Sequence, residues 1–265
     1  MAETPLLLSS KNKNLYDILG GIIMPNWCFN QLTVTGTKEE LIHFIENGLY
    51  GYEAVYALNE FEKKFSQDQT RGTKLVPTMN KIIPVPQDVL DRGYSDAGYD
   101  WQIENWGTKW DFCEFTAHNL EHDLKQTEPN SILSLSFNFN TAWATNEKWV
   151  SKASELFPEL IFDLSYEEEA GFFAGRVAYR ANTELVRRDY TDMVVYRIME
   201  CTDGLEEAVS DRYYCYDDEE TLEDILEQIL DDFETALSLS LTTKEKVIEL
   251  ATAIYNENNK EEEVA

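Results

Sequence analysis

Residues 105–111 bring together the side chains best suited to hold a ligand, in the order Asn-Trp-Gly-Thr-Lys-Trp-Asp. Each tryptophan buries roughly 150–250 Å² and fixes whatever packs on it, so two in one short stretch indicate a wall between a sheet and a loop. Two interpretations stay open. Either Trp106 and Trp110 plug a long insertion onto a sheet, or they line an exposed pocket in which Lys109 and Asp111 touch a ligand.

Residues 118–122 match the H-x-x-E-H pattern of inverted zinc peptidases, with His118 and His122 at its ends. That chemistry needs two histidines one helical turn apart on the metal and a glutamate as base. We expect this segment to run as a strand into a hairpin, without the helical spacing, so we predict no metal site. A hydrolase built around Lys109, Asp111, His118 and His122 remains as an alternative.

Two acidic runs, residues 167–169 and 217–220, have carboxylates of the kind that bind hard cations. Neither run has the spacing of a calcium loop, and we interpret both as solvated charge. The sequence contains no phosphate loop, dinucleotide fingerprint or nucleophile elbow. We therefore predict no cofactor and no catalytic residue.

The net charge of −28 restricts the partners of this protein. Such a surface repels nucleic acid and anionic membranes and attracts basic molecules. The charge is also uneven. Between Glu200 and Glu234 there are 15 acidic residues and one base, Arg212, so this window contributes −14, half of the total.

Within that window, residues 219–237 have the apolar periodicity of an amphipathic helix. Its polar side forms the candidate partner-binding face, made of Glu223, Asp224, Glu227, Asp231, Asp232 and Glu234. At a rise of about 1.5 Å per residue, successive carboxylates on one side stand about 5 Å apart. Double-stranded DNA carries about one charge per 1.7 Å of its axis. The face is either a solvated surface or a mimic of a phosphate array.

Periodicity predicts four strands and two helices in the order strand, helix, strand, strand, helix, strand. Alternating apolar residues mark the strands, and apolar residues three or four apart mark the helices. This is the order of an α+β, ferredoxin-like (split βαβ) fold, with a four-stranded antiparallel sheet and both helices on one face. The expected segments are 28–34, 37–49, 112–120, 132–140, 146–157 and 160–166.

Composition and periodicity divide the chain into three parts. Residues 1–23 form an N-terminal extension, and Met24 is a candidate natural start. Residues 24–178 form the ferredoxin-like domain with an irregular insertion at 50–110. Residues 179–265 form an appended acidic and mainly helical region, in which we expect a short strand at 193–200.

Cysteine spacing and hydropathy bear on the compartment. The four cysteines, Cys28, Cys113, Cys201 and Cys215, form no C-x-x-C pair and indicate reduced thiols. No stretch of 18 apolar residues occurs, so we expect no membrane span. Both observations favour the cytoplasm.

Several motifs together resemble one family. They are Met24-Pro25-Asn26-Trp27-Cys28, Ile83-Pro84-Val85-Pro86, the tryptophan stretch at 105–111, Thr141-Ala142-Trp143, and Tyr166-Glu167-Glu168 followed by Gly171, Phe173 and Gly175. Over roughly residues 24–178 the chain resembles the YubB-type ferredoxin-like proteins of phages and conjugative plasmids. That family has prolines after Thr-Ala-Trp, where this chain has Ala144-Thr145-Asn146. The acidic segment after about residue 180 lies outside the resemblance.

The resemblance implies a ferredoxin-like fold, a mobile genetic element in a bacterial cell, and no catalytic residues. Combined with the charge, it leads us to expect a non-enzymatic interaction protein. Its partner would be a basic or nucleic-acid-binding host protein, which it inhibits by mimicking nucleic acid as a counter-defence factor. We expect no direct contact with nucleic acid or membrane. Besides the hydrolase, a ferredoxin-like RNA-binding module is an alternative, because such sheets can stack bases on aromatic residues.

Overall fold

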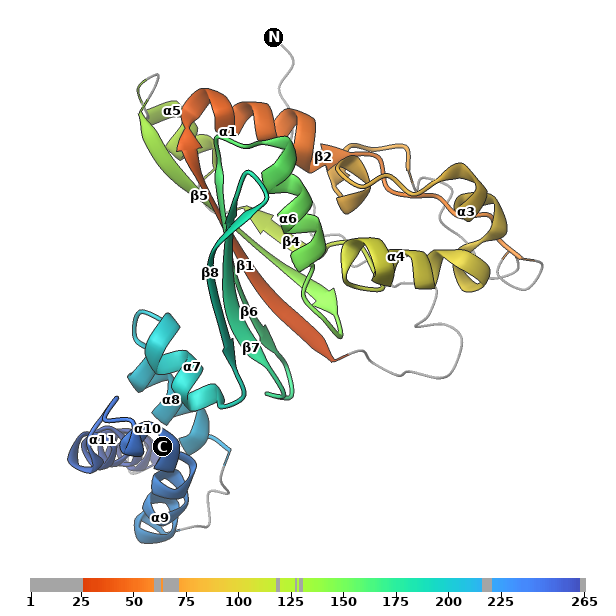
Figure 1. Ribbon diagram of the computed structural model, residues 1–265. Helices are drawn as coiled ribbons and strands as arrows, with labels where there is room; N and C mark the ends of the chain where they lie inside the picture. The colour runs from red at the N-terminus through yellow and green to blue at the C-terminus, as the bar shows by residue number, and fades with distance from the viewer. Residues whose placement is uncertain are drawn as a thin grey trace.

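A six-stranded antiparallel sheet organises the protein (Figure 1). The computed structural model describes residues 26–59, 63, 72–117, 120–126, 128, 131–215 and 221–262. The strand order is β4-β5-β1-β6-β7-β8. The strands are β1 (Trp27–Thr37), β4 (Cys113–Ala117), β5 (Ile132–Ala142), β6 (Ile161–Glu168), β7 (Ala174–Arg180) and β8 (Thr183–Tyr190).

The first four of these strands, with α1 (Lys38–Phe44) and α6 (Glu147–Leu156), confirm the ferredoxin-like fold. In chain order they run β1, α1, β4, β5, α6, β6, and in the sheet β1 lies between β5 and β6. A π-helical turn, Ile45–Leu49, extends α1, and α5 (Leu120–Gln126) joins β4 to β5. A capping box begins α1: the side chain of Thr37 accepts from the Glu40 amide, and that of Glu40 accepts from the Thr37 amide.

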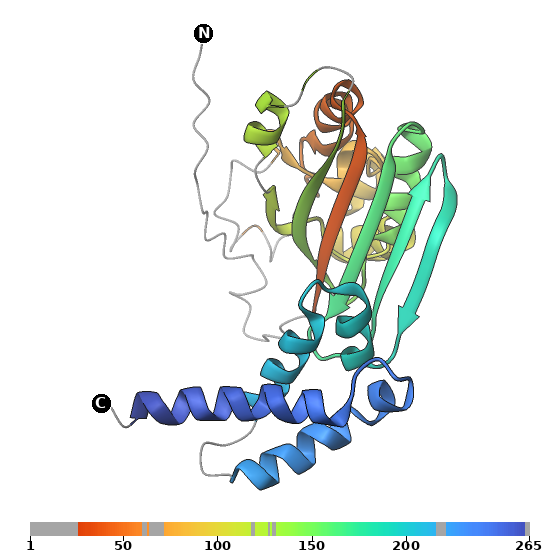
Figure 2. The same ribbon diagram turned by 90° about the vertical axis from the view of Figure 1, so that its left-hand side faces the viewer.

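The core lies between the sheet and these two helices. In β1 the predicted alternation holds, since Leu32 and Val34 are at most 1% exposed. They belong to one apolar cluster with Phe44 of α1 and with Trp149 and Val150 of α6. Figure 2 shows the opposite face of the sheet, away from α1 and α6, with α7 and α8 at its lower end.

Two further strands extend the sheet beyond the predicted four. β7 pairs with β6 and β8 with β7, so the boundary placed at residue 178 falls inside β7. Most residues of β8 are exposed on both faces of the sheet. A strand without a buried face has no apolar alternation, which is why periodicity did not reveal it.

The insertion after α1 is more regular than predicted. It contains a two-stranded ribbon, β2 (Tyr50–Gly51) with β3 (Val76–Pro77), a 3₁₀ turn at Met79–Lys81, α3 (Gln87–Arg92), a π-helical turn at Tyr94–Gly98, and α4 (Tyr99–Trp106). Residues 94–100, in the part of the chain expected to be irregular, form the π-helical turn and the start of α4. In Figure 1 the insertion projects to one side of the sheet.

The C-terminal helices have a core of their own. They are α7 (Met193–Glu200), α8 (Gly204–Tyr213), α9 (Leu222–Asp232), α10 (Glu234–Ser238) and α11 (Lys244–Glu262). Val209, Ile229, Phe233 and Val247 are fully buried among them. The strand predicted at 193–200 is wrong: Asp192 caps α7 by accepting from the Val195 amide at 3.1 Å. The helix predicted at 219–237 breaks at Phe233. In the described part of the chain, no helix combines the length and apolarity that crossing a membrane requires.

Candidate functional site

Trp106, at the end of α4, is a buried plug. It is fully buried, and its indole nitrogen donates to the Ile83 carbonyl at 2.9 Å. The Trp101 ring lies edge-on to it, with the ring centroids 5.8 Å apart. This residue joins the insertion to the domain core, which fits the first of the two interpretations for Trp106.

The Gly-Thr-Lys turn binds the end of β5. Gly107 adopts a φ of 91°, and a side chain there would also approach the Thr145 carbonyl to 3.1 Å, so glycine is required. Thr108 is 1% exposed, and its hydroxyl donates to the Ala142 carbonyl at 3.1 Å. The Ala142 amide donates back to that hydroxyl at 3.2 Å. These bonds place the next residue, Lys109, beside the loop that follows β5.

Asp111 is occupied by internal hydrogen bonds. The Thr78 hydroxyl donates to one carboxylate oxygen at 2.5 Å, and the amides of Met79 and Phe112 donate to the other at 2.7 and 2.9 Å. Burial raises the pKa of Asp111 to about 6, although these three bonds oppose the shift. The carboxylate therefore ties the 3₁₀ turn of the insertion to the start of β4, and it is not a free ligand contact.

This carboxylate predicts a pH-dependent effect of Asp111→Asn. The folded-state pKa of about 6 lies above the usual value of about 3.9. The contribution of Asp111 to stability is thus greatest below about pH 4 and is lost as pH rises through about 6, by at most about 3 kcal/mol. Relative to the unsubstituted protein, Asp111→Asn should gain stability from about pH 4 to 7 in urea unfolding. A constant difference would contradict this, and exposed Asp88→Asn is the control.

Lys109 lies in an aromatic clamp. Its ammonium is 3.9 Å from the centroid of the Trp143 ring and 4.4 Å from that of Trp110. The residue is only 9% exposed, and burial lowers the pKa of its amine. Within the described residues no carboxylate lies at ion-pair distance from this ammonium. The indole faces take the place of water and of a counter-ion.

Trp27 and Trp143 complete the clamp, and the sequence analysis did not assign them a role. The rings of Trp27 and Trp110 lie 5.8 Å apart, and Trp143 is 47% exposed. Trp110 is only partly buried, so Trp106 alone is the plug. The sequence could have pointed to both residues, because Trp27 and Trp143 stand in motifs that carry the family resemblance.

The segment of the histidine pair is a helix where it is described. The strand expected at 112–120 is present as β4, which pairs with β5, but the turn expected to follow it is wrong, because Leu120–Gln126 is the helix α5. His118 lies outside the described residues, and the side chain of His122 does too. No group of three or more His, Cys, Asp or Glu in the described part of the chain is arranged to hold a metal ion. All four cysteines are free thiols.

The six predicted acidic residues lie together on the exposed side of α9 and the start of α10. Two of them have structural contacts: Asp224 forms a capping box with Thr221, and Asp232 lies 3.6 Å from Arg212. The other four, Glu223, Glu227, Asp231 and Glu234, make no ion pair with any described residue.

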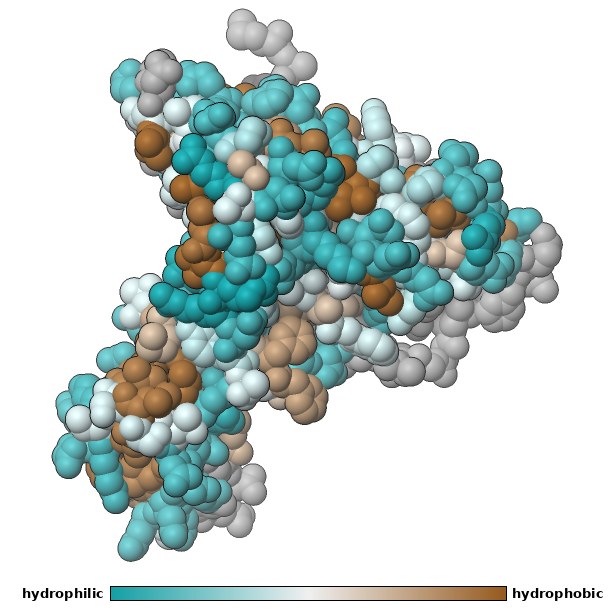
Figure 3. Space-filling view, in the orientation of Figure 1, coloured by the Kyte–Doolittle hydropathy of each residue, from teal (hydrophilic) through white to brown (hydrophobic). Residues whose placement is uncertain are grey.

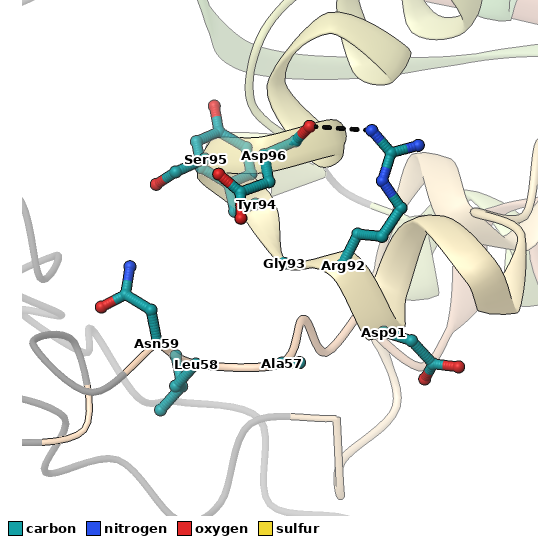
Figure 4. Close-up of a pocket in the computed structure, with 9 residues that line it drawn as sticks. All are labelled: Ala57, Leu58, Asn59, Asp91, Arg92, Gly93, Tyr94, Ser95 and Asp96. Carbon is teal, nitrogen blue, oxygen red and sulfur yellow. Dashed lines mark hydrogen bonds between the residues drawn. The ribbon is translucent and has the colours of Figure 1, made fainter.

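A shallow cavity of about 190 Å³ lies elsewhere, in the insertion (Figure 4). Residues 57–59 and 91–96 line it, and Arg92 donates to the Asp96 carbonyl at 3.1 Å across its rim. Most of these side chains are exposed, and none of the predicted site residues is among them. The cavity therefore adds no chemistry to the tryptophan turn or the acidic face.

Comparison with known proteins finds a family model that matches part of the chain. The family model described as the ferredoxin-like domain in Api92-like protein matches residues 121–236, less than half of the chain. This region runs from α5 into α10. The acidic segment, expected to lie outside the resemblance, is therefore largely inside the matched region.

A solved structure, the protein Api92 from Yersinia pseudotuberculosis, is 11% identical with a TM-score of 0.44, and the alignment covers 63% of this chain and 98% of that one. No curated protein matches. The family model supports the fold and names no activity. This chain is a ferredoxin-like protein, and its residues 121–236 are similar to the ferredoxin-like domain of Api92-like proteins.

Proposed function

We propose that this is a binding protein of a mobile genetic element, and that its acidic helical surface occupies a basic, nucleic-acid-binding surface of a host protein. One observation carries the proposal. Glu223, Glu227, Asp231 and Glu234 are exposed along one side of α9 and α10 and have no cationic partner among the described residues.

The burial pattern shows why this side is held toward solvent. Ile225, Ile229 and Phe233 are at most 4% exposed and pack into the core of the C-terminal helices. Because the apolar stripe is anchored, Glu223, Glu227 and Asp231 keep a defined spacing of about 6 Å along α9, and Glu234 begins α10. A regular array of this kind can match the regular spacing of basic side chains that bind phosphates.

Electrostatics favours a basic partner. A net charge of −28 with a local window of −14 creates a potential that accelerates the encounter with a positively charged protein. In Figure 3 hydrophilic residues cover much of the C-terminal helices, and an apolar patch over α7 interrupts them. Met199 of α7 is 45% exposed. An apolar contact beside a charged surface is the usual composition of a protein interface.

The two alternatives find less support. In a hydrolase, Asp111 would need a free oxygen for chemistry, and both of its oxygens accept hydrogen bonds that hold the insertion. In an RNA-binding sheet, basic residues would have to be available. Arg176 and Arg188 lie on the open face of the sheet, and both are paired with Glu200.

The test replaces the four unpaired acids with glutamine or asparagine and measures capture of partners from a bacterial lysate. Unsubstituted protein should retain basic, nucleic-acid-binding proteins at low salt and release them at about 0.5 M salt, where screening acts within a few ångströms. The fourfold variant should lose most of this retention and still fold. Equal retention by the variant, or no basic protein retained at low salt, would refute the proposal.

A matched control removes the same charge elsewhere. Glu46, Asp88, Asp100 and Glu104 are exposed and lie in α1's extension and the insertion. Their amide variants change the net charge from −28 to −24, as in the test variant. Retention by this control separates a specific acidic face from a general effect of charge.

A further inference from the structure

An exposed aromatic surface lies at the start of β1, on the sheet face opposite α1 and α6. It consists of Trp27, Phe29 and Trp143. Trp110 contacts the Trp27 ring, and Lys109 contacts the Trp143 ring. Phe29 is 46% exposed and Trp143 is 47% exposed. Aromatic side chains with this exposure are costly in water and dominate the energetics of protein interfaces.

Direct contacts connect the tryptophans of the surface, and strand alternation adds Phe29. Trp27 is paired in register with Ala142, next to Trp143, and the Trp143 amide donates to the Asn26 carbonyl at 2.9 Å. The Trp27 ring contacts Trp110, and Lys109 bridges Trp110 to Trp143. Phe29, two residues after Trp27, points to the same face of the sheet.

The backbone at Trp143 is held in an unfavourable conformation. Its φ is 68°, a left-handed value that bulky residues rarely adopt and that costs about 1–3 kcal/mol. The Asn26 carbonyl and a 2.7 Å hydrogen bond from the Thr141 hydroxyl to the Ala144 carbonyl hold the chain on either side. This conformation leaves the indole about half exposed, with Lys109 packed over its ring.

The rim of the surface is acidic. Glu114 accepts from the Asn140 amide group at 2.8 Å, and Asn140 is the register partner of Phe29. Glu169 accepts from the Trp27 backbone amide at 3.0 Å. No described residue supplies a cation to either carboxylate.

We propose that the aromatic surface binds an arginine or lysine side chain of a basic protein partner, stacked on the Trp143 ring on the side away from Lys109 and paired with the rim carboxylates Glu114 or Glu169. Lys109 shows within the chain that the indole of Trp143 accepts a cation on one face. The protein's net charge favours a cation on the other. The inference takes from the proposed function only that the partner is basic, since no residue of α9 takes part.

The experiment titrates octa-arginine peptide into the full chain and follows tryptophan fluorescence and calorimetry. Trp143→Asn removes the ring and keeps a residue that tolerates the left-handed backbone. Binding to this variant should be about tenfold weaker, the range of one desolvated cation–π contact. Trp143→Phe, which keeps an aromatic face, should retain most of the affinity, and thermal melting checks that both variants fold. Unchanged affinity of Trp143→Asn would overturn the inference.

Two further arms keep this inference apart from the proposed function. In the variant that lacks the four acids of α9 and α10, Trp143→Asn should still weaken octa-arginine binding about tenfold. This loss should persist at about 0.5 M salt. An effect of the α9 variant alone would leave the proposed function intact and reject the aromatic site. An effect of Trp143→Asn alone would do the reverse. Trp143-dependent binding of a single-stranded oligonucleotide, with none of octa-arginine, would replace the basic partner by a nucleic acid and overturn the inference.

Discussion

Trp106→Ala is expected to lower the free energy of unfolding by about 3–5 kcal/mol, the usual range for truncating a buried tryptophan. The side chain is fully buried, and its replacement would open a cavity beneath the insertion. It would also leave the Ile83 carbonyl without its indole donor. Urea unfolding measures the loss, and hydrogen exchange should show the insertion opening before the sheet.

The control is Ile103→Ala on the same helix. Ile103 is 39% exposed, and a surface truncation of this kind changes stability by about 0.5 kcal/mol. Trp106→Phe should lie between the two, because it keeps much of the apolar area and loses the hydrogen bond. If Trp106→Ala unfolds at the same urea concentration as Ile103→Ala, the plug interpretation is wrong.

Glu200→Gln is expected to loosen the C-terminal helices from the sheet. The Glu200 side chain is 2% exposed and lies at the end of α7. It accepts from Arg176 at 3.2 Å, from Arg188 at 2.8 Å and from the Tyr190 hydroxyl at 2.5 Å. Because the arginines are partly exposed and Arg176 keeps Asp163, we expect a loss of about 2–3 kcal/mol, less than for a fully buried pair.

The pH dependence gives this prediction a second readout. Burial raises the pKa of Glu200, but the hydrogen bonds from Tyr190, Arg188 and Arg176 outweigh it and hold the pKa below its ordinary range. The stabilising contribution is present above the unfolded-state pKa, about 4.3, and is lost as pH falls through the depressed folded-state pKa. The difference between the two proteins should therefore shrink in acid.

Glu223→Gln is the matched control for Glu200→Gln. It changes the same charge at an exposed residue that has no ion pair with the described part of the chain. It should alter stability by about 0.5 kcal/mol or less. Equal stability of the Glu200 and Glu223 variants at neutral pH would show that the buried carboxylate does not hold α7 to the sheet.

The buried side chains of Trp106 and Glu200 show two different limits of prediction from the sequence. The tryptophan stretch stood out by composition, and a tryptophan plug was one of its two interpretations. Which indole is buried depends on the turn: Gly107, with its φ of 91°, ends α4 after Trp106, and Trp110 consequently lies near the surface. Composition alone could not assign one indole to the core and the other to a clamp on Lys109.

The acidic network at Glu200 was not foreseen. In the sequence, Glu200 only marked the start of the acidic window, and a strand was predicted at 193–200. The positive partners, Arg176 and Arg188, come from β7 and β8, and β8 is exposed on both faces. An exposed strand leaves no periodic signal, so neither the strand nor the ion pairs it supplies could be predicted.

The sequence by itself determined the elements whose burial is one-sided. The alternation in β1, β5 and β6, the apolar stripes of α1 and α6, and the capping box at Thr37 follow from local physics, and together they specify the ferredoxin-like order. The exposed carboxylates of α9 follow in the same way from its buried stripe.

Only the tertiary structure decided which distant residues meet. Lys109 reaches Trp143, 34 positions along the chain, because the Thr108 hydroxyl binds the end of β5. Asp111 meets Thr78 through the folded insertion, and Glu200 meets two strands at the sheet's open face. Periodicity reports which face of an element is buried. It does not report the partner on that face, because packing between elements is set by the three-dimensional register of the whole sheet.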